Sequence, residues 1–323
     1  MESIAVLCLG VFLDFLIGDP WHWPHPVQAI GWAISAYTKL AFRVTNSPRQ
    51  LKLLGVVLTL LTIFGTGAVA WSLVWSARTL HPVLGVGVES VLFASCLAGR
   101  SLRDAAEDVL QPIQLGNLNK ARGRLCLYVG RDTENLEISD ILRAILETVA
   151  ENTIDGVTSP LIYGIVGSIL LPGGAAMLAL AYKAASTLDS MIGYKEAPYT
   201  DLGWCSARTE DVLTWLPCRL TVATIAVLYG SPRHLWQRCC QDAVQDPSPN
   251  SGWSECAYAV ALGVQLGGTN RYRGVVKQKP LLGEPLNPIT PETIRVAIAL
   301  TRQLTLLWFA IGVGAVFALN SVA

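Results

Sequence analysis

The sequence predicts an all-α membrane protein that crosses the bilayer several times, and three observations support this class. Hydrophobic residues make up 52% of the 323 residues, whereas charged residues make up only 15%. The mean hydropathy of +0.43 is high for a soluble domain. Several uncharged runs are long enough to span a bilayer, and no alternating strand pattern stands out. We therefore expect one integral membrane domain over residues 1–323, with helical and loop regions in the cytosol.

Six segments are candidates for membrane helices. Residues 53–77 are the clearest, because no charge falls between Lys52 and Arg78. Residues 3–18 have no Lys or Arg before them and no small-residue cleavage motif after them, so we expect a retained helix rather than a signal peptide. The other candidates are residues 83–99, 160–182, 212–230 and 303–320.

Segment 160–182 has a break at its centre. The tripeptide Pro172-Gly173-Gly174 combines the two residue types that interrupt helices most strongly. We expect a re-entrant helix hairpin that dips into the membrane and returns, with polar motifs on both flanks. The alternative is one kinked spanning helix.

Two polar regions separate the apolar segments. Residues 100–159 have helical patterns, whereas residues 231–301 contain many prolines and are expected to be largely loop. Arg43 and Arg49 near one membrane segment, and Arg100 and Arg103 near the next, favour a cytoplasmic position for those ends. We therefore expect a protein of the cell (inner) membrane with its active site facing the cytoplasm.

Several function classes are excluded by composition and motifs. The 24 basic and 24 acidic residues cancel, which gives no case for a nucleic-acid partner or a polybasic lipid anchor. The eight cysteines lack metal-type spacing and are expected to be reduced thiols. There is no P-loop, no dinucleotide fingerprint and no nucleophile elbow.

Acidic residues repeat at helical spacing near the end of the polar region 100–159, just before the apolar segment 160–182. Arg143, Glu147, Glu151 and Asp155 are four residues apart and would share one face of a helix. Neighbouring carboxylates repel each other unless a cation lies between them, and their hard oxygen atoms suit Mg²⁺. Asn152 adjoins this stripe. The alternative is a solvated acidic face without a ligand.

Further charged residues flank the apolar segments after the hairpin. Asp189 is a candidate metal ligand or a helix N-cap, and Lys195 suits a phosphate or carboxylate. Arg208 precedes an acidic pair that includes Asp211. Arg219 lies within an apolar run and needs a partner, for which Asp211 is the nearest candidate.

The remaining candidates lie in turns and loops. Asp19 and His25 belong to a turn-rich segment, where zinc is disfavoured because no further ligands follow at metal spacing. Arg131 is suited to hold a phosphate or to form a loop ion pair, and Asn250 and Glu255 lie in a polar loop between prolines. Composition and spacing alone indicate a membrane enzyme that handles an anionic, metal-bound substrate.

The longer motifs resemble a known family. They are DFLIGDP, HPVQAIG, YVGRDT, ETVAENTIDGVTSPLIYG, TLDSMIGYK, LGWCSARTEDVLTWLPCRLT, PNSGWSE, LGVQLGG and KPLLGE. In this order, from about residue 13 to residue 284, they resemble cobinamide-phosphate synthases of the CbiB/CobD type. The chain departs from the family pattern at Lys183, Ser186, Glu210 and Thr214, which bears on substrate choice more than on the reaction.

The resemblance implies a late step of cobalamin assembly at the membrane. The propionate carboxyl of adenosylcobyric acid is joined to the amine of aminopropanol phosphate or ethanolamine phosphate, with ATP as co-substrate and Mg²⁺ as cofactor. Implied partners besides these substrates are the lipid bilayer, later cobalamin-assembly enzymes and further copies of the chain. With the resemblance in view, Glu151, Asp155 and Asp189 are the expected Mg²⁺ ligands, and Asp211 is a further ligand or a base. The expected substrate-binding residues are Asp19, His25, Arg131, Asn152, Lys195, Arg208, Arg219, Asn250 and Glu255.

Two rival functions remain open. A transporter or scaffold for corrinoid intermediates should have paired broken helices in two halves, whereas one Pro-Gly-Gly break is evident. A Mg²⁺-dependent membrane phospho-alcohol transferase should carry a tight D-x-x-D cluster, which the sequence lacks.

Overall fold

The computed structural model describes residues 1–18 and 25–322 of the chain. Within these ranges the chain is helical apart from one two-stranded hairpin and the connecting segments. It forms two compact units. The first comprises Met1–Ala98, Asp155–Thr214 and the chain from Leu307 onward, and the second comprises Gly99–Ile154 and Trp215–Leu306.

Five helical stretches among the described residues are long and apolar enough to cross a membrane. They are Pro48–Leu80, Pro82–Gln114, Ile138–Leu170, Trp204–Leu228 and Pro291–Leu319. The predicted class, an all-α protein that passes through the membrane several times, is confirmed. Four predicted segments, 53–77, 83–99, 212–230 and 303–320, fall on helices of this kind, and 3–18 falls on the shorter α1 (Glu2–Leu16).

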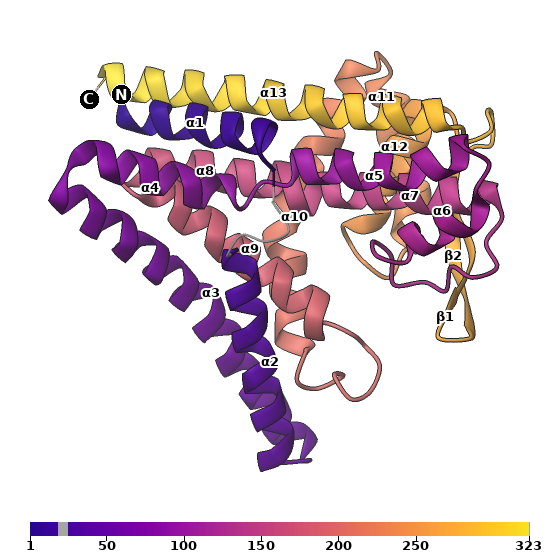
Figure 1. The fold of residues 1–323 in the computed structure, drawn as a ribbon, viewed down its shortest axis with the longest axis horizontal. Coiled ribbons are helices and arrows are strands. Elements are labelled where there is room, and N and C mark those ends of the chain that lie inside the picture. The colour runs from indigo at the N-terminus through magenta and orange to yellow at the C-terminus, as the bar shows by residue number, and fades with distance from the viewer. Residues whose placement is uncertain (19–24, 323) are drawn as a thin grey trace. The chain divides into compact units, whose positions relative to one another are not determined.

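The first unit is built around α9 (Gly174–Ile192). This helix packs against α2 (Pro26–Val44), α3 (Pro48–Leu80), α4 (Pro82–Ala94) and α8 (Ser159–Leu170), and Figure 1 shows it running beside α3. Proline occupies the first turn of α2, α3 and α4, where its missing N–H costs no helical hydrogen bond.

The break predicted at 172–174 is a helix hairpin. α8 ends at Leu170, Gly173 adopts a left-handed φ of 85°, and α9 begins at Gly174. The two helices pack so closely that a Cβ atom on Gly167 would overlap the carbonyl of Gly174. The alternative of one kinked helix is therefore wrong, and the depth of the hairpin in the membrane stays a prediction.

An ion pair stabilises the beginning of α9 in this apolar setting. Glu89, a buried acid of α4, accepts a hydrogen bond from Ala175 N at 3.1 Å and pairs with Arg78 at 2.8 Å. An unpaired carboxylate would be costly there, whereas this one joins α3, α4 and α9.

The second unit has one hydrophobic core that collects residues from most of its elements. α12 (Ser251–Leu262) contacts α7 (Ile138–Thr153), α11 (Pro232–Asp242) and both strands. α5 (Gly99–Gln114) and α6 (Leu118–Leu125) pack against α7. Because α12 is surrounded in this way, eight of its twelve residues, from Gly252 to Ala259, are buried in succession.

The expectation that residues 231–301 are largely loop is wrong. They form α11, α12 and an antiparallel hairpin of β1 (Gln265–Tyr272) and β2 (Val275–Gly283). The hairpin turns at Arg273 and Gly274, both with positive φ, as a two-residue type I′ connection requires. The carboxylate of Asp132 accepts hydrogen bonds from both of these backbone amides, at 2.8 and 2.7 Å. The prolines lie at the first position of α11 and of the helix that starts at Pro291, in the connections and in β2, so they do not prevent folding.

Two long helices have residues in both units. These are α10 (Trp204–Leu228) and α13 (Pro291–Val322). A third helical stretch changes type: α7 ends at Thr153 and a π-helical turn, η1, covers Ile154–Thr158. The α-helical spacing used to predict Asp155 on the face of Glu151 therefore ends two residues before Asp155.

Candidate active site

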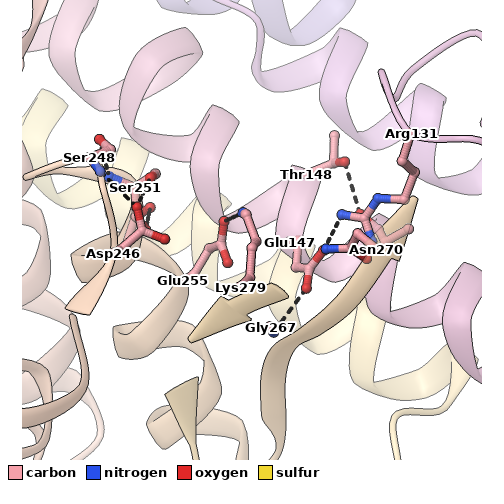
Figure 2. A network of polar contacts seen from close by, with 12 residues as sticks. Arg131, Glu147, Thr148, Asp246, Ser248, Ser251, Glu255, Gly267, Asn270 and Lys279 are labelled. Atoms are coloured by element: carbon pink, nitrogen blue, oxygen red, sulfur yellow. Dashed lines mark hydrogen bonds and ion pairs between the residues drawn. The ribbon is translucent and has the colours of Figure 1, made fainter. Parts of the chain in front are cut away.

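The second unit gathers six charged side chains, which we call the charged cluster: Arg131, Glu147, Glu151, Asp246, Glu255 and Lys279. They come from α7, α12, β2 and two connecting segments, and Figure 2 shows five of them with the residues that hold them. The electrostatic influence of Lys279 reaches three of the glutamates. Chain segments that are more than 100 residues apart therefore contribute to one polar centre.

Glu147 is the member of the cluster whose two carboxylate oxygens both have partners, and we call such an acid saturated. Its side chain is 3% exposed, and one carboxylate oxygen pairs with Arg131. The other oxygen accepts a hydrogen bond from Gly267 N at 3.0 Å and lies 3.4 Å from Nη1 of Arg143. Arg131 also donates to Asn270 Oδ1 at 2.8 Å. Arg131, which the sequence predicted to bind substrate, therefore forms a buried contact between α7 and β1 through Glu147 and Asn270.

Glu255 is buried but only partly satisfied. Its side chain is 0% exposed, and Oε1 lies 2.9 Å from Nζ of Lys279. Its Oε2 atom is buried and has no hydrogen-bond partner. Burial, aided by the charges of Glu147 and Glu151 and opposed by Lys279, raises the pKa of Glu255 to about 8. Burial lowers the pKa of Lys279, but the neighbouring carboxylates outweigh this effect, so the net pKa is raised.

Asp246 lies in the segment that leads into α12. Its Oδ1 atom accepts hydrogen bonds from Ser248 N at 2.9 Å and Ser251 Oγ at 3.2 Å, as Figure 2 shows. Its Oδ2 atom is buried without a partner. A Cβ atom on Gly252 would contact the Asp246 side chain at 2.6 Å, so glycine allows the first turn of α12 to approach this carboxylate.

Arg219 and Asn250, both predicted to bind substrate, bind each other. Arg219 donates to Asn250 Oδ1 at 2.7 Å and to Pro249 O at 2.8 Å. Its guanidinium carbon also lies 4.5 Å from the ring centre of Trp253 and 5.1 Å from that of Trp215. Arg219 therefore holds the segment before α12, where the sequence had suggested Asp211 as its partner.

Glu151 and Asn152 lie in the last turn of α7. Both side chains are exposed, and Asn152 donates to Thr148 O at 2.9 Å. The Glu151 carboxylate interacts electrostatically with Lys279, Asp246, Glu147 and Arg131. It is thus the member of the cluster that is most open to solvent.

The first unit contains the other predicted residues that the structure describes. Asp155 lies in the π-helical turn and is an electrostatic neighbour of Tyr182, whose hydroxyl is 2.9 Å from Thr214 Oγ1. Asp211 interacts electrostatically with Arg208 and Lys195.

Two residues at the ends of helices complete this group. Asp189 lies in the last turn of α9, so its alternative role as an N-cap is wrong. His25 is the N-cap of α2, with Nδ1 accepting from Val27 N at 3.3 Å. Asp19 lies outside the described residues.

The expected Mg²⁺ ligands do not form one described group. Glu151 belongs to the second unit, and Asp155 and Asp189 belong to the first. Among the residues that the structure describes, no three His, Cys, Asp or Glu side chains are placed to hold a metal ion. Mg²⁺ often takes only one or two protein carboxylates together with phosphate and water, and the exposed Glu151 fits that role. The three-residue set stays a prediction.

Lys279 and Asp246 were not among the predicted site residues. Both lie in motifs that the sequence displays, Lys279 at the start of KPLLGE and Asp246 at the start of DPSPNSGWSE. A lysine followed by proline in a strand, and an aspartate two residues before a serine turn, are weak signals alone. Both are electrostatic neighbours of Glu151, and this common position arises only from the packing of β2 and the α11–α12 connection on α12.

Comparisons with known proteins agree with the long motifs. The family model described as CobD/Cbib protein matches residues 7–301. The chain is 50% identical to the cobalamin biosynthesis protein CobD of Synechocystis, over 99% of this chain and 94% of that protein. It is 40% identical to the cobalamin biosynthesis protein CbiB of Salmonella typhimurium, over 95% of this chain and 94% of that protein. No solved structure matches the chain. The chain belongs to the CobD/CbiB family.

Proposed function

We propose that the chain is an adenosylcobinamide-phosphate synthase. It joins the propionate carboxyl of adenosylcobyric acid to the amine of aminopropanol phosphate or ethanolamine phosphate, with ATP as co-substrate. Family membership and the names of the relatives support a role in cobalamin biosynthesis. The observation that carries the enzyme assignment is the charged cluster, in which a buried carboxylate keeps an open acceptor beside a cation.

The chemistry of amide formation explains the need for ATP. A carboxylate is a poor electrophile, because its leaving group would be an oxide. Attack of the carboxylate on the terminal phosphorus of ATP forms an acyl phosphate and releases ADP. Attack of the neutral amine on the acyl carbon then forms the amide, while inorganic phosphate leaves and the amine gives up a proton. Positioning of the reactants supplies most of the acceleration in such reactions.

The residues of the second unit suit parts of this chemistry. Lys279 donates one hydrogen bond to Glu255, and an ammonium group has three N–H donors, so two remain for carboxylate or phosphate oxygens. The Glu151 carboxylate is exposed beside it and is the proposed ligand of Mg²⁺ in this unit. Mg²⁺ bound with ATP would neutralise phosphate charge. Roles for Lys195, Arg208 and Asp211 toward phosphate or the amine remain predictions from the sequence.

The membrane setting is consistent with the substrates. Five apolar helices make the chain a multi-pass membrane protein. We propose that the second unit faces the cytoplasm, where ATP is available, as the arginines at residues 43, 49, 100 and 103 favour.

The test is a direct assay of purified protein in detergent. Adenosylcobyric acid, aminopropanol phosphate and Mg²⁺ are incubated with and without ATP, and products are identified by mass spectrometry. We expect ATP-dependent formation of the amide and stoichiometric ADP. The variant Lys279→Met should reduce the rate, whereas Glu134→Gln, at an exposed position of the same unit, should not. Corrinoid binding by folded protein without any amide product would instead favour a carrier or scaffold.

A further inference from the structure

Two carboxylates of the charged cluster each have one buried oxygen without a hydrogen-bond partner. These atoms are Oε2 of Glu255 and Oδ2 of Asp246. In Figure 2, Glu255 lies between Asp246 and Glu147, with Lys279 against its other oxygen. Buried acceptors in folded proteins are almost always paired. Two unpaired acceptors in one cluster are therefore open to donors from a ligand or from ordered water.

The two oxygens are fixed in place by bonds to their partner atoms. Lys279 holds Oε1 of Glu255, and Ser248 and Ser251 hold Oδ1 of Asp246. Neither carboxylate can rotate to satisfy its second oxygen without giving up these bonds. The two unpaired oxygens are thus held in fixed positions, one just before α12 and one within it.

The charge of the cluster indicates the sign of the ligand group. The cluster contains four carboxylates, from Glu147, Glu151, Asp246 and Glu255, and two cations, from Arg131 and Lys279. Near neutral pH the raised pKa of Glu255, about 8, favours its protonated form, so three negative and two positive charges leave a surplus of one negative charge. A bound cation favours ionisation of Glu255, which makes the surplus two. The adjoining Arg143 pairs with Asp140 as well as Glu147, so this pair adds no net charge. A cationic group is attracted to this surplus.

A primary ammonium group fits these acceptors better than a metal ion does. A metal site made by protein ligands alone requires several that converge on one point, and the described residues contain no such group of three. An ammonium group instead carries three N–H donors that can point to separate acceptors. A charge-assisted bond to a buried carboxylate is also stronger than a neutral one.

We propose that the charged cluster is the subsite for the primary ammonium group of the amine substrate. Oε2 of Glu255 and Oδ2 of Asp246 accept its hydrogen bonds, and the exposed Glu151 carboxylate lies at the open side. Lys279 keeps Glu255 oriented. This inference rests on the proposed function and specifies where the amine-bearing substrate is recognised.

A pair of ligands tests the subsite without any change to the protein. Ethanolamine phosphate carries the ammonium group, and ethyl phosphate lacks it but keeps the phosphate. Isothermal titration calorimetry of the wild-type protein in detergent measures the affinity for each ligand. We expect ethanolamine phosphate to bind about tenfold to a hundredfold more tightly, as for one hydrogen bond to a charged group. Equal affinities would overturn the inference.

Variants test whether residues of the charged cluster cause the preference for ethanolamine phosphate over ethyl phosphate. Glu255→Gln removes the charge and keeps the shape, and Asp246→Asn does the same at the second acceptor. Either change should reduce the preference for ethanolamine phosphate to a few-fold or less, whereas Glu134→Gln should retain it. Full preference in both cluster variants would overturn the inference. So would a loss of Mg²⁺ binding in Glu255→Gln, measured with Mg²⁺ alone, if the ammonium preference is unchanged.

The outcome is separable from that of the ligase assay. Amide formation by a wild-type protein that binds both phosphates equally would retain the proposed function and reject only this subsite. Absence of amide formation together with a clear ammonium preference would reject the ligase and retain the subsite.

Discussion

Glu147 and Glu255 are both buried glutamates of the second unit, yet their surroundings differ in one respect. Glu147 has both carboxylate oxygens occupied, by Arg131, Arg143 and the backbone N–H of Gly267. Glu255 has one oxygen occupied by Lys279 and one oxygen open. Burial alone therefore does not distinguish a structural acid from a functional one. The number of unoccupied acceptor atoms is what separates these two glutamates.

Glu89 of the first unit supports the same distinction. It is as buried as Glu147, and it is bound by Arg78 and by the amide of Ala175. Both saturated acids join distant elements, α7 with β1 in one unit and α4 with α9 in the other. We therefore expect substitutions of saturated acids to affect stability most, and substitutions around Glu255 to affect ligand binding most.

The largest effect on stability is expected for Glu147→Ala. This change leaves the buried guanidinium of Arg131 without its carboxylate, and breaking a buried pair in this way costs about 3–5 kcal/mol. Thermal and denaturant unfolding in detergent, followed by circular dichroism, measures the loss. Glu134→Ala is the matched exposed control. A loss for Glu147→Ala below about 1 kcal/mol would contradict the structural role of Glu147.

A smaller loss is expected for Lys279→Met. Glu255 then loses its one partner, which costs about 1–3 kcal/mol for an unsatisfied buried group. The cost is below that of Glu147→Ala because Glu255 can take up a proton, whereas an arginine cannot release one. The same unfolding experiment measures it. If Lys279→Met were as destabilising as Glu147→Ala, the comparison between the two glutamates would fail.

The pH dependence of stability should also distinguish Glu255. Its pKa is raised from 4.5 to about 8 in the folded protein, so the folded state binds the proton more tightly than the unfolded state. The stability from this group is present below about pH 4.5 and is lost as the pH rises through about 8. One pKa unit corresponds to about 1.4 kcal/mol, so we expect an effect of at least that size.

Unfolding of the wild type and Glu255→Gln between about pH 5 and about pH 9 measures this dependence. The variant lacks the titrating group, so its stability relative to the wild type should increase with pH. The raised pKa of Lys279 acts only above its ordinary value of 10.5 and lies outside this window. Parallel stability curves for the two proteins would show that Glu255 does not titrate there.

The smallest stability effect is expected for Arg219→Lys. Lysine keeps the charge but cannot make both bonds to Asn250 and Pro249 and stack on two tryptophan rings. We expect a loss of about 1 kcal/mol. Because this segment leads into α12, which carries Glu255, KM for the amine substrate should rise while KM for the corrinoid stays unchanged. An equal rise of both KM values would contradict an effect confined to the amine substrate.

The sequence predicts the helices better than it predicts the site. Residues 53–77 are a helix because a long uncharged run has few alternatives in a membrane. Pro172-Gly173-Gly174 interrupts the helix because of local backbone geometry. The β-hairpin was missed because β1 contains two glycines and β2 a proline, which obscure the alternation. Its clearest local signal is Arg273-Gly274, a weak form of the turn pairs that favour hairpins.

The sequence by itself determined the class of this protein, the break between α8 and α9, and the candidate carboxylates, because apolar length, proline, glycine and charge act through neighbouring residues. Only the tertiary structure decided which carboxylate is saturated and which is open. Glu147 receives its backbone donor from Gly267 and Glu255 receives its cation from Lys279 on the neighbouring strand. Such partners are set by the packing of α7, α12 and the hairpin, and the spacing of residues along one helix carries no information about them.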